Sequence, residues 1–95
     1  MKATMRCRVR AYLAHRRALG FRLRSEGYLL LSFARYADQH ASRGRVSNKL
    51  AIAWSSLRKD ADRHCWARRL EAVRRLAKHL IVADPKTEIP PCHLF

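Results

Sequence analysis

The sequence of 95 residues has little glycine, proline or cysteine, with three of each. So few glycines leave no glycine-rich loop to hold a nucleotide phosphate. The cysteines, Cys7, Cys65 and Cys92, cannot all pair with one another and have no C-x-x-C spacing. A disulfide scaffold is therefore not expected, and a reducing cytoplasm fits better.

Long apolar runs are also missing. The longest are a few residues, "YLLL" and "LIVA", far short of the roughly 20 residues that span a membrane. The first 20 residues contain scattered arginines and no apolar core of the kind that secretory signals have. We therefore expect neither a membrane segment nor a secretory signal.

Acidic residues are scarce as well. The chain has 21 Lys+Arg against 7 Asp+Glu, a formal net charge of +14 and a pI near 11.3. Self-repulsion of this size destabilises a small compact protein, so a polyanion that neutralises it is the expected partner. Most of the excess is arginine, whose planar fork suits phosphates and base edges. Nucleic acid is favoured over a merely soluble basic surface.

Apolar residues, 48% of the chain, recur with a helical period, and the alternation typical of strands is absent. The first predicted helix runs from about Thr4 to Leu19 and ends at Gly20, a residue suited to a left-handed stop. The second is predicted to have Ser25 as its N-cap. Its apolar stripe is Leu29, Leu30, Phe33, Tyr36 and Ala37, and its end is near Ala41.

The third predicted helix has Ser47 as its N-cap and an apolar stripe of Leu50, Ala53, Trp54 and Leu57. The fourth starts near Trp66, and Leu70, Val73 and Ala77 continue its stripe at steps of four and three. It ends at Asp84-Pro85, because the residue before a proline disfavours the helical region. The fold prediction is all-α, a compact four-helix bundle, with a helical domain at 1–84 and an extended linker at 85–95.

The fourth helix has a one-sided charge distribution. On a helical wheel Arg68 and Arg75 lie opposite the apolar stripe, with Lys78 beside them, while Arg69 and Arg74 flank the stripe. The flanking stems can cover core edges while their guanidinium groups stay hydrated. Ordinary solvated faces mix both charges in i,i+4 pairs, but here Glu71 cannot neutralise all its neighbours. A DNA major groove admits one such helix.

Other candidates for DNA contact lie outside this helix. Tyr28 and Arg35 share the outward side of the second helix, and Lys49 in the first turn of the third helix opposes the helix dipole. Residues 1–24 contain eight Lys+Arg and no acid, with Arg16, Arg17, Arg22 and Arg24 bracketing Gly20. Two of these four can balance a helix dipole, and the rest fit a phosphate-gripping arm. The candidate DNA-binding residues are Arg24, Tyr28, Arg35, Lys49, Arg68, Arg69, Arg74, Arg75 and Lys78.

Catalytic patterns are not found. The five histidines are scattered and none has zinc-ligand spacing with a cysteine. There is no Ser-His-Asp or paired-carboxylate pattern. Trp54 and Trp66 fall within apolar stripes and are interpreted as core residues. We expect no cofactor, no metal and no catalytic residue.

Three stretches, "YLAHRRALGFRLRSEGYLLLSFARYAD", "VSNKLAIAW" and "WARRLEAVRRLAKHLIVADPKTEIPP", together resemble the N-terminal core-binding domain of tyrosine recombinases, the phage-type integrases. The resemblance covers about Arg10 to Pro91, and the helix "RRL-x-x-VR" followed by "DP…PP" is its most specific part. It implies a four-helix, SAM-like domain that clamps double-stranded DNA, with the second and fourth helices near the groove.

In that family the catalytic arginines, histidine and nucleophilic tyrosine belong to a C-terminal domain, and Tyr12, Tyr28 and Tyr36 match no nucleophile motif. The resemblance thus implies that this segment binds DNA without cutting it. It is expected to be a monomer off DNA, with possible oligomers on DNA formed through the full-length protein. Two alternatives stay open: a helical protein-interaction or oligomerisation module, and a basic RNA-binding domain.

Overall fold

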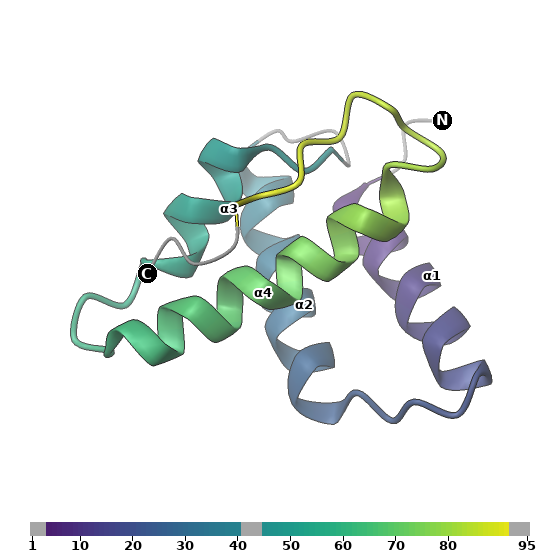
Figure 1. Cartoon of the computed structure of the whole chain (residues 1–95), viewed down its shortest axis with the longest axis horizontal. Helices are drawn as coiled ribbons and strands as arrows, with labels where there is room; N and C mark the ends of the chain where they lie inside the picture. Colours follow the sequence, from purple (N-terminus) through teal and green to yellow (C-terminus); the bar gives the residue numbers. More distant parts are fainter. Residues whose placement is uncertain (1–3, 41–44, 92–95) are drawn as a thin grey trace. The chain divides into compact units, whose positions relative to one another are not determined.

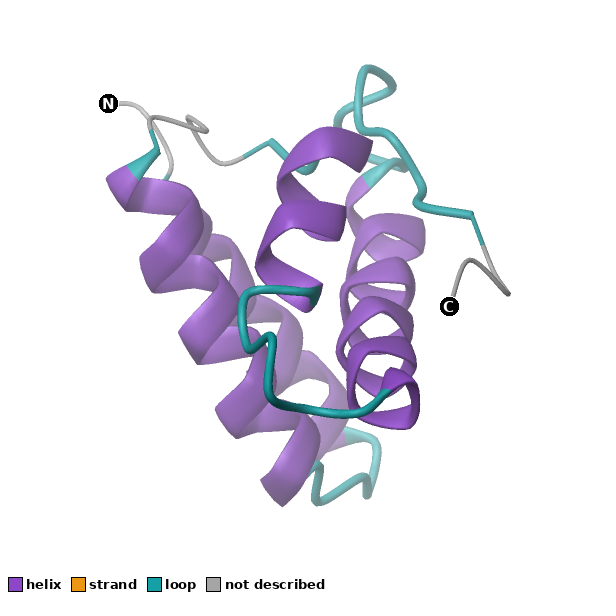
Figure 2. Cartoon of the chain, turned by 90° about the vertical axis from the view of Figure 1, so that its left-hand side faces the viewer, coloured by secondary structure: helices purple, strands orange, loops and turns teal. Residues whose placement is uncertain are grey.

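The computed structural model describes residues 4–40 and 45–91. Within these ranges the chain forms four α-helices and no strand (Figures 1 and 2). The prediction of an all-helical chain with four helices is confirmed. The chain divides into two compact units, Met1–Arg45 and Val46–Phe95, each with one pair of helices.

The first unit pairs α1 (Met5–Ala18) with α2 (Arg24–Gln39). Thr4 caps α1, because its hydroxyl accepts a hydrogen bond from the backbone N–H of Cys7 at 3.1 Å. Asp38, near the end of α2, accepts bonds from the backbone N–H groups of Met5 and Arg6 at 2.9 and 3.2 Å. A carboxylate there also complements the helix dipole. Asp38 near the end of α2 therefore caps the N-terminus of α1.

The connection from α1 to α2 is a Schellman turn. The N–H of Phe21 donates to the carbonyl of Arg16 at 3.1 Å, and that of Gly20 to the carbonyl of Arg17 at 3.0 Å. Gly20 has φ +100°, a left-handed conformation that glycine adopts without steric cost. The predicted helix stop at Gly20 is confirmed.

The start of α2 corrects one prediction. Ser25 is not the N-cap: α2 begins at Arg24, and Leu23, with φ 51°, holds the cap position without a side-chain hydrogen bond. The connection positions the chain here, since Arg17 Nε donates to the carbonyl of Arg22 at 3.2 Å. Local capping preference predicts where a helix can start, but the turn before α2 makes the helix begin one residue before Ser25.

Core residues of the first unit follow the predicted period with adjustments. The buried set is Met5, Val9, Tyr12 and Leu13 on α1, and Gly27, Leu30, Phe33, Ala34 and Ala37 on α2. Leu19 is 61% exposed because it lies in the turn after the helix. Leu29 and Tyr36 are only partly buried.

The second unit pairs α3 (Asn48–Ser55) with α4 (Arg63–Leu80). Ser47 is the N-cap of α3, as predicted, and its hydroxyl accepts from the N–H of Leu50 at 3.2 Å. Asp62 caps α4 by accepting from the N–H of Cys65 at 2.9 Å. This cap starts α4 before Trp66, where the sequence pattern placed its beginning.

The buried side of α3 differs from the predicted stripe. Ala51, Trp54 and Ser55 are buried, whereas Ala53 is exposed and Leu57 is 49% exposed. The helix ends at Ser55, so Leu57 lies beyond it. Burial of Ser55 carries no unsatisfied hydroxyl, because its Oγ donates to the carbonyl of Ala51 at 2.7 Å.

The chain after α4 packs against the start of α3. α4 ends at Leu80, and residues 85–91 are not helical. The N–H of Glu88 donates to the carbonyl of Val46 at 3.0 Å, and Glu88 Oε1 accepts from the N–H of Asn48 at 2.7 Å. Thr87 and Pro90 are buried. The described part of the predicted linker is thus held by the second unit, while 92–95 lie outside the described residues and a linker role stays a prediction.

Candidate nucleic-acid interface

The outer face of α4 is a basic surface. Arg68, Arg75 and Lys78 are exposed on it, as are His64 and His79. At about 1.5 Å of rise per residue, Arg68 and Arg75 lie roughly 10 Å apart along the helix axis. Because the two residues are two turns apart on the same helix, the distance between their backbones is fixed. We call Arg68, Arg74, Arg75 and Lys78 the α4 basic face.

A single carboxylate lies on this face. Glu71 Oε1 is 3.8 Å from Arg74 Nη1 and 3.6 Å from Arg75 Nε. The side chains of Glu71 and Arg75 are 42% and 59% exposed, so these ion pairs are weak. One negative charge shared by two guanidinium groups leaves the face positive.

Arg69 has a different environment from its neighbour Arg68. Its guanidinium carbon lies 4.2 Å from the ring centroid of Trp54, and only 9% of the residue is exposed. Burial lowers the pKa of Arg69. Cys65 opposes this shift by raising the pKa, and the positive charge of Arg58 adds to it by lowering the pKa. This cation–π contact links α4 to α3. Arg69 therefore belongs to the packed side of α4, and little of it is left for a DNA duplex.

Trp66 also has a role that the apolar period did not reveal. It is only partly buried, and its indole Nε1 donates to the carbonyl of Arg58 at 2.8 Å. The bond ties the start of α4 to the preceding connection. Trp54, in contrast, is 1% exposed and is a core residue as predicted.

Lys49 is exposed in the first turn of α3, as the sequence pattern indicated. Next to it, the carboxylate of Glu88 accepts a hydrogen bond from the N–H of Asn48. An internal acid thus already occupies part of the α3 N-terminus.

The candidates in the first unit lie along α2. Arg24, Tyr28 and Arg35 are all exposed, Tyr28 by 80%. Spacings of four and seven residues place them on one side of the helix. Tyr28 Oη can donate to or accept from a phosphate or base edge, which keeps this row as a candidate contact.

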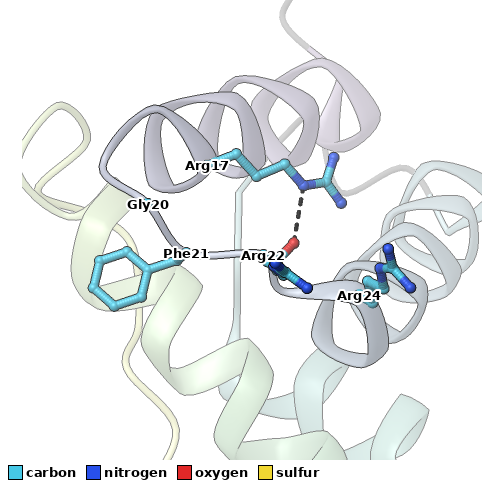
Figure 3. A pocket seen from close by; sticks show the side chains of 5 residues that line it. All are labelled: Arg17, Gly20, Phe21, Arg22 and Arg24. Carbon is cyan, nitrogen blue, oxygen red and sulfur yellow. Dashed lines mark hydrogen bonds between the residues drawn. The ribbon is translucent and has the colours of Figure 1, made fainter.

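Arg24 also lines an open hollow at the connection between α1 and α2. The lining residues are Arg17, Gly20, Phe21, Arg22 and Arg24 (Figure 3). Of these, the sequence pattern selects Arg24 as a candidate DNA-binding residue and places Arg17 and Arg22 only among the arginines that bracket Gly20. The acid-free run 1–24 with arginines on both sides of Gly20 was the available signal for the other two arginines. What the sequence could not show is that the turn brings all three together.

Other kinds of site are not found in the described parts of the chain. Residues 4–40 and 45–91 hold no group of three His, Cys, Asp or Glu side chains placed to bind a metal ion. Over the same residues, none of the helices combines the length and apolar character of a membrane span.

Comparison with known proteins gives one informative relative. Over 93 residues, 98% of this chain, the sequence is 37% identical to the integrase/recombinase y4rB of Sinorhizobium fredii strain NGR234. The aligned part is 29% of that protein, so the chain spans less than a third of the relative's length. This finding supports the predicted relationship to integrases and recombinases. No protein-family model matches the chain, and no solved structure matches it.

Proposed function

We propose that this chain is a double-stranded DNA-binding module of a site-specific recombinase or integrase, in the role of the core-binding domain. The observation that carries the proposal is the α4 basic face, where four cations lie on one helix with a single carboxylate, Glu71, which pairs with two of them. Similarity to an integrase/recombinase over nearly the whole chain supports the same conclusion independently.

The geometry of the α4 basic face suits one side of a duplex. A helix fits the major groove, and Arg68 and Arg75 project from the side opposite the buried stripe. Arginine is the side chain that most often reads guanine there, through a bidentate contact. Arg74 and Lys78, one turn apart, would contact phosphates along the groove edge. Clamping by these groups requires no bond-breaking chemistry.

The proposal assigns no catalytic step to this segment. Recombination chemistry would belong to the part of a longer protein that this chain does not include, consistent with the 29% coverage of the relative. The module would hold the duplex while that part acts on it. DNA integration and recombination are thus proposed as functions of the whole protein.

Binding to a fluorescent duplex at several salt concentrations tests the proposal. Neutralising about five to eight phosphates predicts that log K falls against log salt with a slope of roughly −4 to −7. Competition with an RNA duplex of the same sequence separates DNA binding from general affinity for polyanions. Absence of duplex binding at low salt, or binding that does not depend on salt, would refute the proposal.

A further inference from the structure

The hollow between α1 and α2 is a second basic site, separate from α4 in the sequence. We propose that Arg17, Arg22 and Arg24 bind one phosphate group of the duplex backbone in this hollow. The inference rests on the proposed function, because it assumes that the ligand of the chain is a DNA duplex. It adds a specific contact point on the first unit and a specific chemical group for it.

Arg17 forms one wall of the hollow and donates a hydrogen bond across the turn. Its Nε donates to the carbonyl of Arg22 at 3.2 Å, and a terminal nitrogen lies 3.0 Å from where a Cβ on Gly27 would be. The absence of a side chain at Gly27 therefore lets this guanidinium cross from α1 to the first turn of α2.

The turn places the other two arginines on the same side. Figure 3 shows the guanidinium groups of Arg17, Arg22 and Arg24 on one side of the connection, with the ring of Phe21 directed the other way. Phe21 is held there by Arg16, whose guanidinium carbon lies 4.2 Å from the ring centroid. Arg16 is thus occupied by stacking, and three arginines remain around the hollow.

The electrostatic surroundings favour an anion. No acid occurs in residues 1–25, and Glu26, partly buried, is the nearest carboxylate in sequence. Arg22 and Arg24 are both exposed. The α2 N-terminus adds a favourable dipole, and its cap residue Leu23 has no side chain that could supply a negative partner. Three guanidinium forks next to one helix start match a single phosphate better than a base edge.

A phosphate contact and a base contact have different signatures in binding data. Removing a phosphate contact weakens binding equally on all sequences and lowers the salt slope by about one, whereas removing a base contact relaxes specificity at one position. With a slope of about 0.9 per phosphate, one contact contributes roughly eightfold to affinity at 0.1 M salt relative to 1 M.

The test measures duplex binding by Arg22→Gln and Arg24→Gln across a salt series, with Arg10→Gln as control. Arg10 is exposed on α1 and does not line the hollow. Because the three arginines share one phosphate, we expect each hollow variant to lose up to about eightfold in affinity at 0.1 M salt and up to about 0.9 in slope, on two unrelated duplexes alike. The control should change by less than about twofold, as for a charge that makes no phosphate contact. Circular dichroism melting checks that every variant is folded.

Methylphosphonate substitution locates the contact. Replacing the backbone phosphates one at a time by this uncharged group should reveal a position that weakens the unaltered protein but not Arg22→Gln. Failure of the unaltered protein to bind any duplex would overturn the proposed function and this inference with it. Normal salt-dependent binding with unchanged hollow variants, or losses equal to those of Arg10→Gln, would overturn the inference alone.

Discussion

Arg68 and Arg69 are adjacent in the sequence, but replacing them by alanine is predicted to have different effects, a loss of duplex binding for Arg68 and a loss of stability for Arg69. Arg68 is exposed on the α4 basic face, while the guanidinium of Arg69 lies on Trp54 and is 9% exposed. Arg68→Ala should weaken duplex binding by about 1–3 kcal/mol if it reaches a base. Its stability should stay within about 0.5 kcal/mol of the unaltered protein, as for other surface substitutions.

Arg69→Ala should instead lower the free energy of unfolding. A cation–π contact at a desolvated site contributes about 0.5–2 kcal/mol, and loss of the packed aliphatic stem adds to that. A total of about 1.5–3 kcal/mol is reasonable for these two effects. Arg69→Met keeps an aliphatic stem and removes the guanidinium group, whose Nε is buried without a hydrogen-bond partner. It should therefore cost less than Arg69→Ala, because it also relieves that desolvation.

Urea unfolding followed by tryptophan fluorescence measures these effects, since Trp54 and Trp66 both lie in the second unit. Binding is compared at a temperature where each variant is fully folded. Duplex affinity of folded Arg69→Ala within about twofold of the unaltered protein is the expected result. If instead it binds as weakly as Arg68→Ala, the buried and exposed sides of α4 have been assigned wrongly.

Three further predictions concern carboxylates. Glu71→Gln should strengthen duplex binding by about three- to tenfold, because a negative charge beside two arginines is removed, and weaker binding in the same salt titration would contradict it. Asp38→Asn should lower the free energy of unfolding by about 1–2 kcal/mol, since the carboxylate closes the α1 N-terminus with two hydrogen bonds, and an unchanged melting temperature would argue against this role. Glu88→Ala should cost about 1 kcal/mol through the lost bond to the first N–H of α3; hydrogen exchange at that helix measures it, and unaltered protection would refute it.

Helix positions were predictable because each depends on signals close together in the sequence. Gly20 ends α1, and Ser47 starts α3, as their local chemistry indicates. Ser25 is not the cap because the turn after α1 ends at Leu23, which already occupies the N-cap position with φ 51°. A capping preference describes one residue, whereas the start of α2 depends on a turn that begins in the previous helix.

The candidate site was predictable in outline only. Periodicity separated Arg68 and Arg75 from the apolar stripe, and both are exposed. It placed Arg69 at the stripe edge, but could not show that Trp54 would come within 4.2 Å of its guanidinium carbon. The partner lies on another helix, and single-helix patterns contain no information about such contacts. Charge composition alone thus overstates the number of arginines free to bind DNA.

The salt slope of binding tests this division of the arginines directly. Arg16 stacks on Phe21 and Arg69 on Trp54, so neither should neutralise a phosphate. The cations that remain on the two proposed surfaces are Arg17, Arg22, Arg24, Arg68, Arg74, Arg75 and Lys78. If the hollow binds one phosphate and each of the four cations of the α4 basic face binds one, the slope lies near −4.5. A value near −10 would require cations outside both surfaces to reach the duplex. Binding would then depend on the positive charge of the whole chain, formally +14, and not on the α4 basic face and the hollow.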